Sequence, residues 1–383
     1  MATIKTDGFN DPFDQLLPSP ETAIQTKRVN SRSGKITKIN NLTYDTIEVT
    51  ITCDKNTPPF NANAGQYATL KVDGIARPRA YSFAKAPALE KQNQITLFIR
   101  LVEGGELSDW FKQKKRSRAP VTVSGPMGKF GLDNSDDTIV CVAGGSGMSA
   151  IKALVEQACH QSLARDCLFF YGARTQADLY CLEEMEAIKQ QWHPDHSFAF
   201  IPVLSEEPDD CDWQGPKGLV TEYLKTHYLD TNQLDINHIK AFFCGPPPMI
   251  DHGVKVLQDA GLVEQSIRYD KFEDVRSPAP VIDNQKCTLC DECLLVKPVE
   301  NCIVELSDFS HSRQTGMTNA KNIVPGQTSG LYYNTLFFNN GQCIRCYACV
   351  DACESRDYEQ NRDSYRYCDI RVDNCSRSLR ELD

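Results

Sequence analysis

Two cysteine triplets in the last quarter of this 383-residue chain share the spacing C-x2-C-x2-C. Thiolates separated by two residues can wrap three corners of a cubane, and the fourth ligand of each cluster can come from the opposite motif. The pattern therefore predicts two [4Fe-4S] clusters and a protein that carries single electrons. The segments KCTLCDECLLVKPVENC and QCIRCYACVDACES supply eight candidate ligands: Cys287, Cys290, Cys293, Cys302, Cys343, Cys346, Cys349 and Cys353.

The first motif lacks one expected ligand. In the bacterial run C-x2-C-x2-C-x3-C-P the residue before the proline is a ligand, and here Lys297 precedes Pro298. Cys302 is the obvious substitute, so we expect it to complete the cluster held by the second triplet; a three-iron or open-iron cluster is the alternative. Zinc ligands or disulfides are the other use of such cysteines. Zinc sites usually bring separated pairs to one tetrahedron, so paired triplets favour clusters.

Composition argues against several other classes of protein. The length indicates two or three domains, and 41% hydrophobic with 24% charged residues is ordinary for a globular chain. A formal net charge of −10 argues against nucleic acid as a partner, because nucleic acid attracts basic surfaces. Ten of the 17 cysteines lie after residue 286, unlike a secreted disulfide scaffold, so we expect a cytoplasmic protein. Neither a signal peptide nor a membrane span is expected.

The order of the sequence patterns predicts four regions. Residues 1–27 lack any period and indicate an extended tail. Residues 28–132 alternate in short runs between Gly, Pro and Asn, which is typical of an antiparallel β-barrel. Residues 133–275 alternate strands and helices, as in a parallel sheet with helices on both faces. After a linker, residues 283–383 would form a small α+β domain around the clusters. We therefore expect a multidomain protein.

The parallel-sheet region contains eight expected elements. Apolar runs predict its strands, and amphipathic stretches predict its helices. The strands are expected at residues 138–144, 167–173, 197–205 and 239–245, and the helices at 148–161, 177–191, 220–228 and 248–261.

The barrel segment ARPRAYSFAKAP contains Arg79, Ala80, Tyr81 and Ser82 after a predicted strand. A flavin needs a cation on its pyrophosphate, an aromatic ring against its isoalloxazine or ribityl chain, and a hydrogen bond near N5. An R-x-Y-S strand offers all three at a period of two residues. Taken alone, the tetrad is more often mere barrel surface.

Two further segments carry a resemblance to a known family. EGGELSDWF places Gly105, Leu107 and Ser108 where a helix begins, so that backbone amides can bind the second half of a pyrophosphate. GPMGKF, at residues 125–130, closes the barrel. In this order and spacing the three motifs resemble the ferredoxin–NADP reductase family, particularly the reductase components of bacterial oxygenases. The resemblance covers residues 30–275 and implies FAD in the barrel.

VCVAGGSGMSAIKAL holds Gly145, Gly147 and Met148 between a strand and a helix, where glycines let the backbone approach a pyrophosphate. A tight strand-to-helix turn needs glycine in any case. The acidic residue of the dinucleotide fingerprint, expected about 20 residues later, is absent, and the second strand ends in Arg174. This arginine could hold the 2′-phosphate of NADPH, but its GART-x-x-D-L context resembles reductases that use NADH. We favour NADH and leave NADPH open.

FFCGPPPMI is the most specific flavoprotein signature in the chain. A strand delivers Cys244 and Gly245 to the carboxyl edge of the sheet, and the prolines from Pro246 onward start a helix that carries Met249. The resemblance implies that Cys244 lies beside the nicotinamide ring and that Phe272, in YDKFED, covers the flavin. Buried core residues would also explain both positions.

Together these motifs predict an NAD(P)H-dependent oxidoreductase. A hydride carries two electrons and a cluster accepts one, so FAD would divide the pair while Ser82, Cys244 and Phe272 hold the reacting centre. The cysteine region resembles two-cubane ferredoxins over residues 283–360. The first hypothesis is the reductase component of a multicomponent oxygenase, serving a separate terminal oxygenase. The alternatives are another acceptor, such as a dehydrogenase or hydrogenase-like complex, and a flavoprotein whose clusters are structural or redox-sensing.

Overall fold

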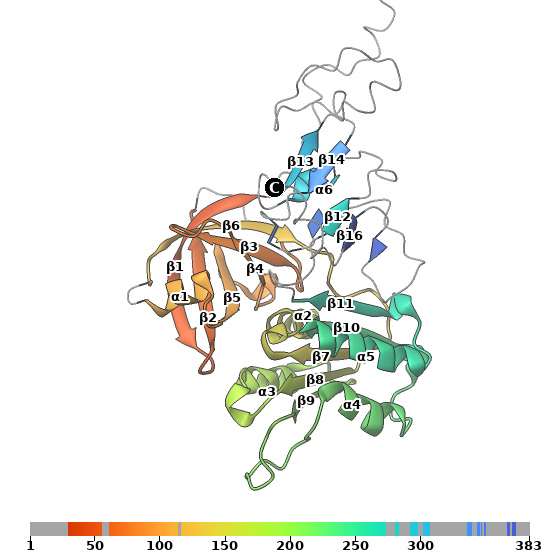
Figure 1. Cartoon of the computed structure of the whole chain (residues 1–383). Helices are drawn as coiled ribbons and strands as arrows, with labels where there is room; N and C mark the ends of the chain where they lie inside the picture. Colours follow the sequence, from red (N-terminus) through yellow and green to blue (C-terminus); the bar gives the residue numbers. More distant parts are fainter. Residues whose placement is uncertain are drawn as a thin grey trace, which may run out of the picture.

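The computed structural model describes most of residues 30–272 and parts of the chain beyond them (Figure 1). The predicted tail and residues 273–279 of the predicted linker lie outside the described residues. Within the described part, the chain forms a six-stranded sheet, a five-stranded sheet and two small sheets. The described ranges are 30–55, 61–113, 116–272, 280–282, 292–297, 302–306, 335–338, 343–344, 346, 348–349, 366–367 and 370–372.

The first sheet is the predicted antiparallel barrel, in the strand order β4-β3-β6-β1-β2-β5. It closes just after β4, where Phe83 bridges Leu97 of β5 and the amide of Ala84 donates to the carbonyl oxygen of Thr96 at 2.9 Å. Alternate residues along the strands fill the interior, as their period of two predicts. The elements are β1 (Ser31–Asn41), β2 (Thr46–Cys53), β3 (Tyr67–Val72), β4 (Arg79–Ser82), β5 (Gln94–Arg100), α1 (Glu106–Lys112) and β6 (Pro120–Met127).

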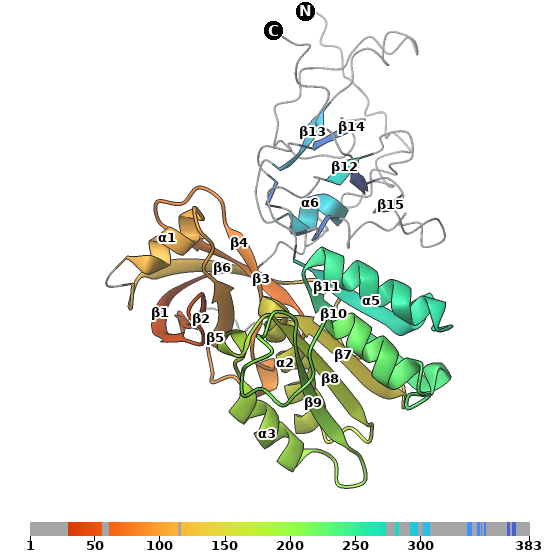
Figure 2. The same cartoon turned by 60° about the horizontal axis from the view of Figure 1, so that its bottom comes forward.

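The second sheet is parallel throughout, in the order β11-β10-β7-β8-β9, and confirms the predicted alternation of strands and helices. Helices α2 and α3 share an apolar core with Phe98 of the barrel, whereas α4 and α5 cover the other face (Figure 2). The elements are β7 (Thr138–Gly144), α2 (Met148–His160), β8 (Cys167–Ala173), α3 (Leu182–Gln191), β9 (Phe198–Leu204), α4 (Val220–Leu224), β10 (Ile239–Gly245), α5 (Pro247–Asp259) and β11 (Ile267–Lys271).

Two details of this domain differ from expectation. The helix expected from residue 177 begins only at Leu182, because Cys181 adopts a left-handed backbone with φ of 61°. A separate turn precedes it, in which Asp178 accepts hydrogen bonds from the amide and hydroxyl of Thr175. Strand β11 was not expected, although it completes the sheet beside β10.

The C-terminal part lies beyond β6 and β11 in both views (Figures 1 and 2). Its described strands form the antiparallel pair β13–β14 and the antiparallel sheet β12-β16-β15. Among the described residues, no helix is long and apolar enough to cross a membrane. The elements are β12 (Pro280–Ile282), α6 (Glu292–Val296), β13 (Ile303–Leu306), β14 (Thr335–Phe338), β15 (Arg366–Tyr367) and β16 (Ile370–Val372).

Candidate functional site

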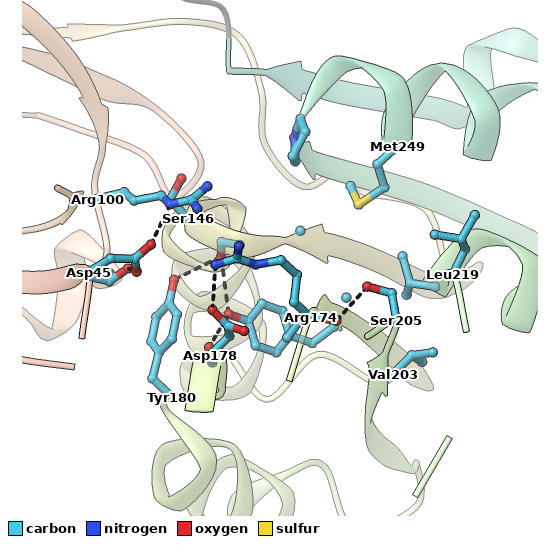
Figure 3. A pocket seen from close by; sticks show the side chains of 18 of the residues that line it. Asp45, Arg100, Ser146, Arg174, Asp178, Tyr180, Val203, Ser205, Leu219 and Met249 are labelled. Atoms are coloured by element: carbon cyan, nitrogen blue, oxygen red, sulfur yellow. Dashed lines mark hydrogen bonds and ion pairs between the residues drawn. The ribbon is translucent and has the colours of Figure 1, made fainter. Parts of the chain in front are cut away.

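A cleft of about 290 Å³ opens between the barrel and the carboxyl edge of the parallel sheet (Figure 3). The barrel contributes Thr46 and the ion pair of 2.9 Å between Asp45 and Arg100, and the sheet domain contributes the rest of the lining. Ligands of open α/β sheets bind at this edge, because the turns after the strands bring helix N-termini and polar groups together there. The cleft therefore uses both domains.

The glycine turn after β7 lies at the floor of this cleft. Gly145 has φ of +52° and no atom within 4 Å of the place a Cβ would occupy, so it leaves open space beside the backbone. Gly147 is required for a different reason, because its surroundings are crowded and a Cβ there would collide with the carbonyl of Cys244. Met148 is buried in the core, so only its backbone can face a ligand. This turn fits the pyrophosphate of a dinucleotide.

Arg174 extends over the cleft from the end of β8, and its guanidinium is already engaged (Figure 3). It donates to the carboxylate of Asp178 at 3.2 Å and to the hydroxyl of Tyr44 from the barrel. Tyr44 in turn donates to Asp178 at 2.8 Å. Burial alone would raise the pKa of Asp178, but the hydrogen bonds from Tyr44, Thr175 and Arg174 outweigh it and lower that pKa. A carboxylate thus lies next to the arginine that could hold a 2′-phosphate.

The R-x-Y-S strand and the helix after the G-G turn meet at the barrel surface. Arg79 forms an ion pair of 3.4 Å with Glu106 at the start of α1, which brings the two predicted flavin motifs together. Ser108 is buried, and its hydroxyl accepts from the amide of Val102 at 2.9 Å, so it shapes the turn. Leu107 is likewise buried in the barrel core.

Tyr81 and Ala80 on this strand and Gly105 in the turn before α1 differ in their exposure and surroundings. Burial raises the pKa of Tyr81, which therefore stays a neutral phenol, whereas Ala80 is exposed. Gly105 caps α1 with an extended backbone, and a Cβ there would press on Val102 and Ser108. An arginine, a neutral phenol and a glycine turn close together fit a flavin with its pyrophosphate.

Two of the three residues expected at the reacting centre, Ser82 and Cys244, lie next to one carboxylate. Ser82 donates to Asp270 of β11 at 3.4 Å, and the thiol of Cys244 lies 4.0 Å from the same oxygen. Phe272 is tied to this place because its amide donates to the carbonyl of Gly245 at 2.9 Å. Burial, and then the charge of Asp270, raise the pKa of Cys244, so this cysteine is a neutral thiol rather than a nucleophilic thiolate.

A buried ion pair on α2 connects the sheet domain to the segment that follows β4. Strand β4 carries the R-x-Y-S motif and is called the flavin strand here. Lys152 and Glu156 pair with only 7% and 11% of their side chains exposed. Lys152 also donates to the carbonyl of Ala84 at 3.3 Å, and Glu156 accepts from the amide of Ala86 at 2.8 Å. The chain that leaves the R-x-Y-S strand is therefore fixed to the helix that follows the glycine turn.

Five of the candidate cluster ligands lie among the described residues, and one of them, Cys346, packs against Tyr67 and Met127 of the barrel. Four of them are buried: Cys293, Cys302, Cys343 and Cys349. Burial raises the pKa of Cys349 most, and the neighbouring thiols Cys346, Cys293, Cys343 and Cys302 raise it further. Among the described residues, no three His, Cys, Asp or Glu side chains are arranged to hold a metal ion. Cys287, Cys290 and Cys353 lie outside the described residues.

Lys297 occupies the position of the ligand that the first motif lacks, and it binds the backbone next to Cys302, the expected substitute ligand. Its ammonium group donates to the carbonyl oxygen of Ile303 at 2.7 Å, directly after Cys302. The lysine thus holds the backbone directly after Cys302.

Sequence reasoning missed several residues of the site. Asp178 is the acid of GART-x-x-D-L and Asp270 is the acid of YDKFED, so both carried a signal in quoted motifs. Tyr44 and the pair Lys152–Glu156 had none, because they act across the interface between two domains.

Comparisons with known proteins agree with these two domains. The family described as Oxidoreductase FAD-binding domain matches residues 33–131, and that described as Oxidoreductase NAD-binding domain matches residues 141–255. The xylene/toluene monooxygenase electron transfer component XylA of Pseudomonas putida is 37% identical over 240 residues, which cover 63% of this chain and 65% of that protein. The phenol 2-monooxygenase reductase component DmpP of Pseudomonas sp. strain CF600 is 34% identical, over 56% of this chain and 58% of that protein.

A solved structure gives the same answer for the fold. The cytochrome P450 reductase GcoB of Amycolatopsis superposes with a TM-score of 0.56 at 27% identity, over 64% of this chain and 70% of that one. The match spans less than two thirds of the length of the two sequence relatives. From residue 33 to residue 255, the chain carries the FAD-binding and NAD-binding oxidoreductase domains of the ferredoxin reductase family.

Proposed function

We propose that this protein is the reductase component of a multicomponent oxygenase, which passes electrons from NADH through FAD and two [4Fe-4S] clusters to a separate terminal oxygenase. The observation that carries the proposal is the contact of the second cysteine triplet with the barrel, where Cys346 packs against the cluster of Tyr67 and Met127. The relatives named above are reductase or electron transfer components of monooxygenases. A different acceptor protein would use the same chemistry up to the last step.

The residues divide between the two cofactors. FAD would be held by the R-x-Y-S strand and the turn before α1, with Arg79, Ala80, Tyr81, Gly105 and Ser108. The nucleotide would bind in the cleft around Gly145 and Arg174. The rim of this cleft would be formed by Gly245, Pro246 and Met249. When bound, FAD takes two electrons at once from a nicotinamide and releases them singly. The task of the chain is to orient the two rings, since reactions of this kind gain most from positioning.

The carboxylates of the site favour NADH over NADPH. A bound 2′-phosphate would lie beside Asp178 and would need the guanidinium of Arg174, which Asp178 and Tyr44 already engage. The ribose 2′-hydroxyl of NADH, in contrast, can donate to a carboxylate without repulsion.

The assignment of cluster ligands rests on the spacing of the cysteines in the sequence. We assign Cys302, Cys343, Cys346 and Cys349 to one cluster, with Lys297 bracing the Cys302 loop. The other cluster would take Cys287, Cys290, Cys293 and Cys353.

Iron and sulfide analysis, with low-temperature electron paramagnetic resonance of the NADH-reduced protein, tests this proposal. Two clusters require about eight irons and about eight sulfides per chain. Cys302→Ser should lose about half of both, whereas the control Cys211→Ser, which alters a thiol of the sheet domain, should lose none. Zinc without sulfide would refute the clusters. Flavin that bleaches with NADH while the clusters never do would support a structural or sensing module instead.

A further inference from the structure

A tyrosine of the barrel contacts the cysteine-bearing segment directly. The hydroxyl of Tyr67, the first residue of β3, donates a hydrogen bond of 2.8 Å to the carbonyl oxygen of Cys346. Tyr67, Met127 and Ala348 form one buried apolar cluster, and Val296 and Cys346 pack against it. The second cysteine triplet therefore has a specific place on the barrel, made of one hydrogen bond and an apolar contact.

The position of Tyr67 in the sheet connects this contact to the flavin strand. Tyr67 lies directly opposite Ser82 of β4 on one side and Met127 of β6 on the other. Directly opposed residues of antiparallel strands point to the same face, with Cβ atoms about 5 Å apart. From Ser82 to Cys346, the path therefore crosses a single strand spacing, the side chain of Tyr67 and a single hydrogen bond.

The local sequence makes room for this tyrosine. The pairing of β3 with β6 shifts between Tyr67 and Thr69, and such a bulge re-aims side chains. Gly128, in the segment GPMGKF, has φ of +89°, and a Cβ there would come within 2.9 Å of the Tyr67 ring. The second glycine of this segment thus leaves space for the ring, whose residue remains only 8% exposed.

We propose that Tyr67 seats the 343–349 segment on the barrel and makes the cluster of that segment the first acceptor of electrons from the flavin. This inference rests on the proposed function. NADH gives up one hydride and becomes NAD⁺. Bound FAD would take the two electrons of this hydride together and supply them one at a time across the Tyr67 contact to the clusters, and one proton would be released to solvent. Tyr67 is a positioning residue, because it touches the backbone of a cluster ligand.

The test uses the full-length holoenzyme without oxygen and compares the wild type with Tyr67→Phe, Met127→Ala and the control Tyr223→Phe. Tyr223 lies on α4, on the far face of the parallel sheet. Stopped-flow absorbance separates flavin reduction by NADH from cluster reduction by flavin. Hydrogen–deuterium exchange of residues 343–349 in the oxidised protein, without NADH, reports docking independently of activity.

Tyr67→Phe should retain iron, sulfide, FAD and the rate of flavin reduction, while cluster reduction slows by roughly threefold to tenfold, the worth of one hydrogen bond in the docked fraction. Exchange of residues 343–349 should rise by a similar factor, and Tyr223→Phe should change neither quantity. Met127→Ala should act in the same direction from the apolar side. Unchanged cluster reduction and unchanged exchange in both variants would overturn the inference. If the wild type held no iron or sulfide, the proposed function would fail, yet the exchange comparison would still decide the docking.

Discussion

At the scale of single residues, two aspartates connect groups that the motifs present separately. Asp178 joins Arg174 of the sheet domain to Tyr44 of the barrel. Asp270 lies within reach of both Ser82 and Cys244. Each carboxylate therefore contacts two groups that come from different elements of the fold.

Replacing Asp178 should change the nucleotide preference. Asp178→Asn removes the negative charge and frees the Arg174 guanidinium, so the ratio of kcat/KM for NADPH to that for NADH should rise by on the order of tenfold. Steady-state kinetics of flavin reduction with both nucleotides measures it. Asp209→Asn, at an exposed loop position, is the control and should leave the ratio unchanged. An equal ratio in the two variants would contradict the role of Asp178.

Replacing Asp270 should slow the chemical step more than it weakens nucleotide binding. Asp270→Asn keeps the shape but loses the charge-assisted hydrogen bond to Ser82, and we expect flavin reduction to slow by about tenfold with KM for NADH changed by less than about twofold. The matched control is Asp230→Asn, which breaks an exposed ion pair with Lys225 of the same domain. Stopped-flow reduction at saturating NADH distinguishes the two, and a defect confined to KM would argue against the assignment.

The sequence alone predicts the residues whose role depends on their own backbone. Gly145 and Gly147 follow from a strand-to-helix turn, and the structure gives each the open or crowded surroundings that require glycine. The partners of Arg174 could not be predicted in this way. Tyr44 precedes Arg174 by 130 positions, and only the packing of one domain on the other brings them together.

At the scale of elements, α2 has two functions in the same molecule. Its N-terminus follows the glycine turn at the cleft, and its buried pair Lys152–Glu156 holds the backbone after β4. The distance between the flavin strand and the nucleotide turn is therefore fixed by one helix.

Breaking the buried pair should be costly, whereas replacing both partners should not. Glu156→Gln leaves the Lys152 ammonium buried without its countercharge and should lower the free energy of unfolding by about 3 kcal/mol. The double variant Lys152→Met with Glu156→Leu should recover most of that loss. Lys112→Met, from the exposed pair with Asp109, should change stability by less than about 1 kcal/mol. Urea unfolding measures all three, and equal losses in the single and double variants would refute the argument.

Prediction of elements succeeds where the hydrophobic period is long. The strands from β7 to β10 and the helix α2 lie where their apolar patterns place them. The start of α3 does not, because the left-handed Cys181 interrupts a pattern that is helical on both sides. Strand β11 has only five residues, of which only Ile267 is buried, so its pattern carries little signal.

At the scale of the whole molecule, aspartates with lowered pKa values join separate segments. Asp133 precedes strand β7, and its carboxylate binds the guanidinium of Arg165. Arg165 is buried and also donates to the carbonyl oxygen of Asp137. Burial would raise the pKa of Asp133, but the hydroxyl of Ser135 and the charge of Arg165 outweigh it and lower that pKa. Asp45, Asp166 and Asp178 behave alike.

These carboxylates should make the protein sensitive to acid. Because their folded pKa values lie below the unfolded value of about 3.9, the stability they contribute is complete above that pH and is lost as the pH falls through the folded values. Asp133→Asn should therefore lower the free energy of unfolding by about 1–3 kcal/mol at pH 7 and by progressively less as the pH falls below about 3.9. Urea unfolding across this range measures it, with Asp209→Asn as the control. A loss independent of pH would show that charge is not the cause.

The cleft draws Asp45, Thr46 and Arg100 from the barrel and its remaining lining from the sheet domain. A nucleotide bound there contacts two folding units at once, and any ligand that binds only the native state raises the temperature at which that state melts. Calorimetry should therefore find NAD⁺ raising the melting temperature of the barrel together with that of the parallel-sheet domain and narrowing the interval between the two transitions. In each catalytic cycle, the two domains would then be more stable while the nucleotide is bound than after it has left.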